Sequence, residues 1–224
     1  MNAKKIQKFI NDPSSGIDSY EDGVVFFNNE KLFENLQKTY ATYSLLRDDA
    51  NSNYARCPNP PDYFTEKLAI YVLGADSVGR CIDNSNADLY DKKNDVFIQL
   101  KTSTCESNDC TSFSPKTLGN HKILFLDIEN IDNRLTGNAL LYEVHPKFFQ
   151  NIVLNLKKNE TFEDQQKQGK RPRTSLKKVI ANNNIEPIME ININSLLQAE
   201  TKKQSKTLFN YLKTINEKIR KILM

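Results

Sequence analysis

The chain has 224 residues, with 31 lysines and arginines against 28 aspartates and glutamates, so its formal net charge is only +3. This charge does not by itself indicate a nucleic-acid-binding protein, and no apolar run approaches the roughly 18 residues that a membrane-spanning helix needs. Four scattered cysteines and the lack of a signal-like apolar segment lead us to expect a cytoplasmic protein with reduced thiols and no membrane partner.

The charge is distributed unevenly along the chain. Residues 1–150 contain 16 basic and 21 acidic residues, a net charge of −5, whereas residues 151–224 contain 15 and 7, a net charge of +8. Such an asymmetry suggests that one end of the chain faces a polyanion. A solvated, lysine-rich helix at the C-terminus would produce the same asymmetry.

The first 61 residues are predicted to form a mainly helical N-terminal part. An amphipathic segment is expected at 3–11, a brief apolar run occupies 22–28, and residues 48–61 resemble a loop. A helix is expected over 30–47, because its apolar residues are spaced three and four apart: Leu32, Phe33, Leu36, Tyr40, Tyr43 and Leu46.

Residues 62–149 are predicted to form a mixed α/β core. A helix over 62–73 would begin at Asp62 as its N-cap and end at Gly74. Residues 121–128 are almost continuously apolar, which is typical of a strand in the middle of a sheet. The expected strands are 77–82, 87–90, 96–102, 121–128 and 139–144, with a polar turn at 91–95 and a polar connection at 103–120.

The last third of the chain, 150–224, is predicted to be a basic part of the same single domain. A short helix is expected at 146–156, a polar basic loop at 163–173, a second helix from about Thr174, and a strand at 188–193. A terminal helix would cover 206–224, with an apolar stripe that must be buried on its own domain or on a partner chain. The stripe consists of Leu208, Leu212, Ile215, Ile219 and Ile222.

One strand–turn–strand segment carries candidate chemistry. Gln99 and Lys101 are two residues apart on a predicted strand and therefore share a face, while Leu100 points to the other face. Asp88 lies at the end of the preceding short strand, so a hairpin can bring the three polar side chains to one point. An acid, an amide oxygen and a lysine together suit a Mg²⁺-dependent phosphodiesterase site.

Asp88, ten intervening residues, and then Gln99-Leu100-Lys101 resemble the PD-(D/E)xK nuclease motif, with Gln99 in place of the usual acid. The sequence that follows this motif resembles type II restriction endonucleases. The similar segments are 111–116, the two apolar strands and residues 169–176. The resemblance covers about 62–178. It implies an α/β, restriction-endonuclease-like core with a central mixed β-sheet flanked by helices.

The resemblance also implies roles for individual residues. Asp88 would be the main Mg²⁺ ligand, and Gln99 would offer its side-chain oxygen to the metal or to a water. The backbone carbonyl of Leu100 would face the metal. Lys101 would contact the attacking water and the scissile phosphate. Glu66, on the preceding helix, matches a position where family members carry an extra acid.

Plainer interpretations remain for these residues. Asp83 and Asp91 are rivals of Asp88 for the metal, and Glu66 is also a common residue in the first turns of a helix, where the helix dipole favours an acid. His121 and His145 belong to no nucleophile motif and are assigned no role. Cys105 and Cys110 lack nearby partners for a zinc site.

A second candidate site is the basic segment at 170–178, which is predicted to bind DNA. Arginines suit guanine edges and lysines suit phosphates, and a proline between two arginines indicates a loop of defined shape. A solvated face is the alternative. The predicted DNA-binding residues are Lys170, Arg171, Arg173, Lys177, Ser114 and Lys116.

The expected function is that of a type II restriction endonuclease: Mg²⁺-dependent, sequence-specific hydrolysis of double-stranded DNA that leaves 5′-phosphate ends. A homodimer is expected, because enzymes of this kind commonly cut palindromic sites with one active site per strand. Two alternatives stay open. One is a structure-specific repair or junction nuclease of the same fold, and the other is a non-catalytic DNA-binding protein with a decayed site.

Overall fold

The computed structural model describes residues 16–53, 59–82, 87–104, 111–113, 122–131 and 134–197. The predicted segment at 3–11 and the terminal helix at 206–224 lie outside these residues. None of the described helices is long and apolar enough to cross a membrane.

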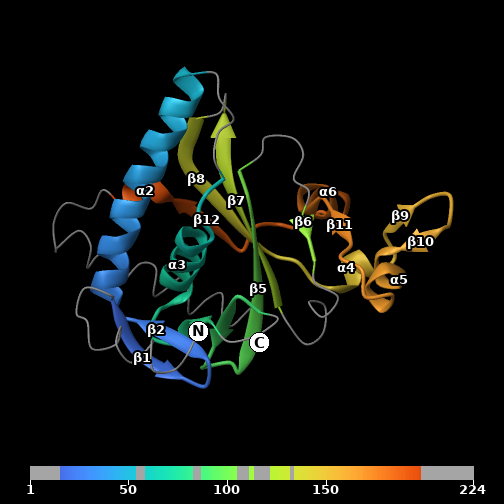
Figure 1. The fold of residues 1–224 in the computed structure, drawn as a ribbon, viewed down its shortest axis with the longest axis horizontal. Coiled ribbons are helices and arrows are strands. Elements are labelled where there is room, and N and C mark those ends of the chain that lie inside the picture. The colour runs from blue at the N-terminus through green and yellow to red at the C-terminus, as the bar shows by residue number, and fades with distance from the viewer. Residues whose placement is uncertain are drawn as a thin grey trace.

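The core of the molecule is an eight-stranded mixed sheet in the order β1-β2-β3-β4-β5-β7-β8-β12 (Figure 1). Neighbouring strands pair antiparallel, except that β5 and β7 are parallel. The strands are β1 (Ile17–Glu21), β2 (Val24–Phe27), β3 (Val78–Cys81), β4 (Leu89–Asp91), β5 (Val96–Ser103), β7 (Lys122–Ile131), β8 (Arg134–Glu143) and β12 (Met189–Asn192).

Helices α2 (Asn29–Ser52), α3 (Asp62–Leu73) and α7 (Ile193–Leu197) contribute to a large apolar core on one face of this sheet. Leu32 and Leu36 of α2 and Leu68 and Ile70 of α3 are fully buried there. Alternate residues of β5 and β7, including Leu100 and Leu124, complete the core from the sheet. The period of two along each strand leaves the other residues for the opposite face.

The opposite face carries a smaller lobe, which we call the side lobe, formed by 111–113 and 144–182. It contains β6 (Thr111–Ser112), α4 (Lys147–Gln150), β9 (Val153–Asn155), β10 (Glu160–Thr161), α5 (Phe162–Lys167), β11 (Arg173–Thr174) and α6 (Leu176–Asn182). Its own apolar cluster consists of Phe113, Ile123, Phe125, Val144, Phe149, Phe162, Leu176 and Val179. Ile123 and Phe125 belong to β7, so this strand is buried on both faces, as its continuous apolar sequence predicts.

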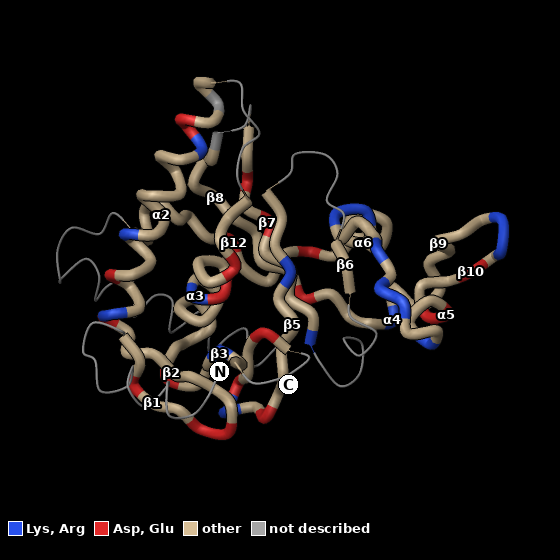
Figure 2. Tube along the Cα trace, in the orientation of Figure 1, with Lys and Arg blue, Asp and Glu red and all other residues tan. Residues whose placement is uncertain are grey.

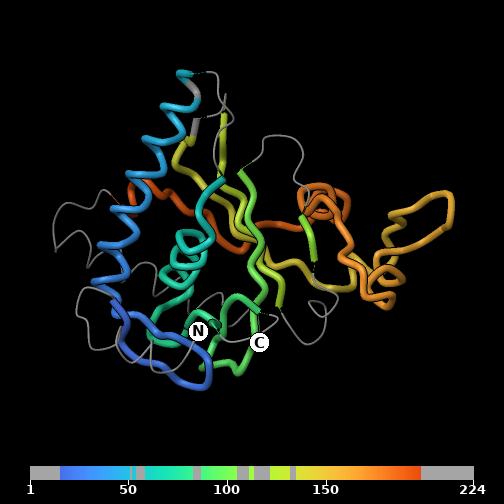
Figure 3. Tube along the Cα trace, in the orientation of Figure 1, coloured from blue at the N-terminus to red at the C-terminus, as the bar shows by residue number. Residues whose placement is uncertain are grey.

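β6 joins the side lobe to a segment far along the chain. Arg173 pairs with Ser112 and Thr174 with Thr111, and the backbone N–H of Phe113 donates to the Pro172 carbonyl at 3.0 Å. In Figure 3, β6 therefore runs beside a segment of clearly later colour. This pairing brings the predicted basic segment next to the end of β5.

The expected α/β class and mixed central sheet are confirmed, and so are the helix at 62–73 and the central strand at 121–128. Several boundaries differ. Residues 48–52 continue α2, so the predicted loop begins later, and β1 and β2 add two sheet strands to the part that was predicted to be helical. Strands β7 and β8 extend well beyond their predicted limits.

Three local predictions were wrong. The N-cap of α3 is Pro61, not Asp62. The helix expected at 146–156 stops after four residues and is followed by β9, while much of the loop expected at 163–173 is α5, whose start is fixed by a capping box between Thr161 and Asp164.

The apolar stripe of α2 is also shorter than predicted. Leu46 is 56% exposed, whereas its neighbour Arg47 is 3% exposed and donates to the Tyr43 hydroxyl at 3.0 Å. A buried hydrogen bond therefore replaces an apolar contact at this turn of the helix.

Candidate active site

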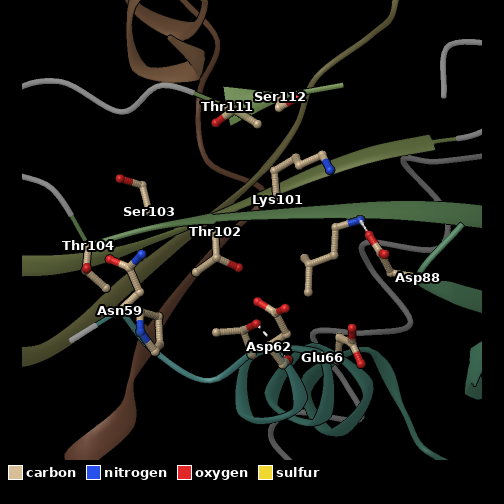
Figure 4. A pocket seen from close by; sticks show the side chains of 13 residues that line it. Asn59, Asp62, Glu66, Asp88, Lys101, Thr102, Ser103, Thr104, Thr111 and Ser112 are labelled. Carbon is tan, nitrogen blue, oxygen red and sulfur yellow. Dashed lines mark hydrogen bonds between the residues drawn. The ribbon is translucent and has the colours of Figure 1, made fainter. Parts of the chain in front are cut away.

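An open pocket of about 390 Å³ lies where the start of α3 faces β5 and β6. Its wall is mostly polar, as Figure 4 shows. The lining residues are Asn59, Pro60, Asp62, Thr65, Glu66, Asp88, Leu100, Lys101, Thr102, Ser103, Thr104, Thr111 and Ser112. Asp88, Leu100, Lys101 and Glu66 were predicted site residues, and all four line this one pocket.

Asp88 is held from both sides by the sheet. It lies directly before β4, and not at the end of a strand as predicted. Its backbone N–H donates to the Ile98 carbonyl at 3.0 Å, and its carbonyl accepts from the Cys81 N–H at 2.9 Å. The carboxylate accepts from the Leu100 N–H at 2.8 Å and from the Gln99 side-chain amide. Asp88 and Gln99 are therefore in direct contact, as predicted.

Lys101 lies on the face of β5 that points toward the side lobe. Figure 4 shows its side chain on the side of Thr111 and Ser112, whereas Asp62 and Glu66 lie across the strand on α3. Its ammonium group is 5.6 Å from the centre of the Phe113 ring. Burial lowers the pKa of Lys101, and the nearby charge of Asp88 opposes this change. Lys101 and Asp88 thus interact electrostatically across the end of the pocket.

Glu66 forms an ion pair with Arg80 of β3. Burial raises the pKa of Glu66 to about 7, against an ordinary value of 4.5, and the charge of Arg80 only partly offsets this effect. The negative charge of Asp88 raises the Glu66 pKa further, so the two acids lie within electrostatic reach of each other. Sequence reasoning missed Arg80, although a lone arginine within the apolar strand at 77–82 was a signal for it.

The donor set of the pocket fits a Mg²⁺ ion. Burial also raises the pKa of Asp88, and the charge of Lys101 and the Leu100 N–H oppose this change. Among the described residues, no three His, Cys, Asp or Glu side chains form a metal cluster by themselves. Mg²⁺ does not need such a cluster, because it commonly uses one or two carboxylates and completes its shell with waters and phosphate oxygens. Asp88 and Leu100 line the pocket and offer a carboxylate and a carbonyl of this kind, and Gln99, which contacts Asp88 but does not line the pocket, carries an amide oxygen.

Asp91, one of the rivals for the metal, is used by the turn that follows it. Its carboxylate accepts from the backbone N–H groups of Lys93 and Asn94, at 3.0 and 3.4 Å, and from the Asn94 side chain at 2.6 Å. The other rival, Asp83, lies outside the described residues. His145 also has a local role, since its Nδ1 accepts from the Lys147 N–H at 3.1 Å.

The predicted DNA-binding residues fall into two groups. Lys170 pairs with Glu160 at 2.9 Å, and Lys177 pairs with Asp127 of β7 at 2.8 Å. Both lysines therefore tie parts of the side lobe in place. No such acidic partner is found for Arg171 or Arg173 among the described residues, and both are exposed. Ser114, Lys116, His121, Cys105 and Cys110 lie outside the part of the chain that the structure describes.

Arg171 lies close to the pocket. Its charge lowers the pKa of Lys101, after the larger effect of burial, and the pairing of β11 with β6 fixes the adjacent backbone. Figure 2 shows that lysines and arginines gather over the side lobe. One strand, β5, thus separates a group of acids on α3 from a group of cations on the side lobe.

Comparison with known proteins gives a consistent result. A family model described as Bsp6I restriction endonuclease matches residues 28–183, which run from α2 through α6 and include the whole pocket. The type II restriction enzyme Bsp6I of Bacillus sp. (strain RFL6) is 28% identical over 170 residues, which make up 74% of this chain and 90% of that relative. No solved structure matches the chain.

Proposed function

Because the chain belongs to the Bsp6I restriction endonuclease family, we propose that it is a type II restriction endonuclease that hydrolyses double-stranded DNA at a specific sequence. Mg²⁺ is the proposed cofactor, and 5′-phosphate and 3′-hydroxyl ends are the proposed products. The observation that carries this proposal is the contact of Asp88 with Gln99, beside Lys101, in a pocket that also contains Glu66.

Asp88 is the proposed principal metal ligand, with Gln99 and the Leu100 carbonyl completing the protein donors. A bound Mg²⁺ would neutralise charge on the phosphate and lower the pKa of a bound water. The Gln99 amide nitrogen donates to Asp88 in this structure, and the amide oxygen is the atom proposed to bind the metal or a water. The backbone hydrogen bonds of Asp88 to Ile98 and Cys81 position its carboxylate next to Gln99 and Leu100 of β5.

Lys101 is proposed to orient the attacking water and to stabilise negative charge on the scissile phosphate. Its burial and the Phe113 ring restrict the side chain to the pocket. A preoriented cation in a partly dehydrated site stabilises a transition state more than a solvated one does. Glu66 is proposed to orient a water or the metal shell from the opposite side, with Arg80 holding its carboxylate.

Arg171 and Arg173 are the proposed contacts with the DNA, because they are exposed beside the pocket and, within the described part of the chain, have no acidic partner like those of Lys170 and Lys177. Arginine forks suit guanine edges and phosphates. A homodimer is proposed, since one such pocket cuts one strand and a two-fold arrangement brings a second pocket to the other strand.

The test is a digest of plasmid DNA with Mg²⁺, with mapping of the fragment ends. Discrete fragments with 5′-phosphates support the proposal. Cutting only at branches or gaps would indicate a structure-specific nuclease, and binding without any cutting would indicate a decayed site. The K101A variant should bind the DNA and lose cleavage. Normal cutting by K101A would overturn the assignment of the site.

A further inference from the structure

A β-hairpin projects from the side lobe, at the end farthest from α2 (Figure 1). We call it the arm; it consists of β9, the turn at 156–159, and β10. Leu156 at its turn is 89% exposed, the largest exposure among the large hydrophobic side chains of the described residues. Lys157 and Lys158 follow it, are also exposed, and have no acidic partner among these residues. An apolar side chain beside two unpaired cations is unusual in a turn, where small polar residues predominate.

The arm is connected to the pocket by hydrogen bonds and packed side chains at its base. Glu160 of β10 accepts from Gln165 at 3.0 Å and from Lys170 at 2.9 Å, which ties the arm to α5 and to the basic segment. Phe162, the next residue but one, is fully buried against Phe113 and Phe149. The Phe113 ring in turn lies beneath the ammonium group of Lys101. A continuous set of packed side chains therefore connects the arm to the phosphate side of the pocket.

The charge of the arm indicates its partner. Its tip carries two unpaired lysines, and the adjoining basic segment adds Arg171 and Arg173. Two copies of this tip would repel each other in a symmetric contact, whereas a polyanion is attracted to it. The duplex that occupies the pocket is such a polyanion and extends past the cleaved bond on both sides.

We propose that the arm binds the DNA duplex outside the cleaved step, with Lys157 and Lys158 on backbone phosphates and Leu156 in the adjacent groove. This proposal rests on the proposed function, because it takes the duplex to be bound at the pocket. The arm then serves as a second contact that lengthens the footprint on the DNA. It adds affinity that depends on salt but carries little base specificity.

The experiment compares the salt dependence of DNA binding in three proteins: wild type, K157A/K158A, and the matched control K31A/K38A, which removes two lysines from α2. Fluorescence anisotropy with a 30-base-pair duplex in EDTA measures binding without cleavage. The slope of log K against log salt should become shallower by about 2 in K157A/K158A, since each lost phosphate contact removes about one. The control should keep the wild-type slope.

A second variant tests the apolar contact. L156A should weaken binding roughly three- to ten-fold with an unchanged salt slope, because it removes buried apolar area and no charge. The proposal is overturned if K157A/K158A keeps the slope of the control. It is also overturned if L156A alters only the sedimentation coefficient, since the arm would then contact a second copy of the chain. Both readouts are measured without metal, so a failure of the wild type to cut plasmid DNA is a separate result.

Discussion

The two sides of β5 differ in charge and in the kind of support they receive. On one side, Glu66 and Asp62 lie on a twelve-residue helix over the large apolar core, and Asp88 is held between two strands. On the other side, Lys101 and Arg171 depend on the side lobe, with its short helices and two-residue strands. The proposed metal side of the pocket is therefore built into α3 and the main sheet, whereas the proposed DNA side draws on the side lobe as well as on β5.

The first test of this comparison concerns Asp88. D88N should lower the cleavage rate on the order of 10³-fold, comparable to the loss of a key charge-stabilising group, while DNA binding in EDTA stays within a few-fold of wild type. Single-turnover cleavage and anisotropy measure the two effects. The exposed Asp76 provides the control D76N, and a loss of binding in D88N equal to its loss of cleavage would contradict the assignment to the metal side.

The second test concerns the side lobe. F162A should lower the free energy of unfolding by about 3–5 kcal/mol, because Phe162 is fully buried against two other phenylalanines. Urea denaturation measures this change. F97A is the control, since Phe97 is 42% exposed and should lose less than about 1.5 kcal/mol. If F162A lost no more free energy of unfolding than F97A is expected to lose, the side lobe would contribute little to stability.

The third test uses the Glu66 pKa of about 7. A carboxyl whose pKa is higher in the folded than in the unfolded state takes up protons on folding, so its contribution to stability falls as the pH rises from about 4.5 to 7. Between pH 4 and pH 8, E66Q should therefore gain up to about 3 kcal/mol relative to wild type. Urea denaturation in EDTA at several pH values measures this difference. The variant E34Q on α2 should show no such gain, and parallel pH curves for E66Q and wild type would disprove the raised pKa.

The smallest expected effect is a difference in DNA affinity between variants of Arg171 and Lys170. R171A should weaken DNA binding by about 1–2 kcal/mol, whereas K170A should weaken it less, because Lys170 is already paired with Glu160. Anisotropy at fixed salt measures both. If K170A weakens DNA binding more than R171A does, Lys170 leaves its ion pair with Glu160 to bind DNA. The distinction between lysines that stabilise the side lobe and arginines that bind DNA would then be wrong.

Much of the main sheet was predictable, because its signals are local. The period of two in β5 placed Gln99 and Lys101 on one face, and the apolar run of β7 predicted a central strand. The position of Asp88 beside Gln99 also followed from the hairpin. The predicted roles of these residues are tested only by the experiments above.

The side lobe was less predictable, because its elements are short and depend on contacts between distant parts of the chain. The start of α5 did have a local signal, the capping box of Thr161 and Asp164, but Thr161 lies outside the segment that was predicted to be a loop. The pairing of β6 with β11 joins segments about sixty residues apart. The pairing of Glu66 with Arg80 likewise becomes visible only when α3 packs on β3.

The parallel pairing of β5 with β7 has a consequence for the order in which the protein is synthesised. The crossover between these strands carries β6, whose partner β11 emerges from the ribosome much later than β5. Asp88, Glu66 and Lys101 are therefore synthesised well before Arg171 and Arg173, which complete the cationic side of the pocket. If Arg171 and Arg173 bind DNA as proposed, we expect the nascent chain to bind DNA weakly until β11 has been translated.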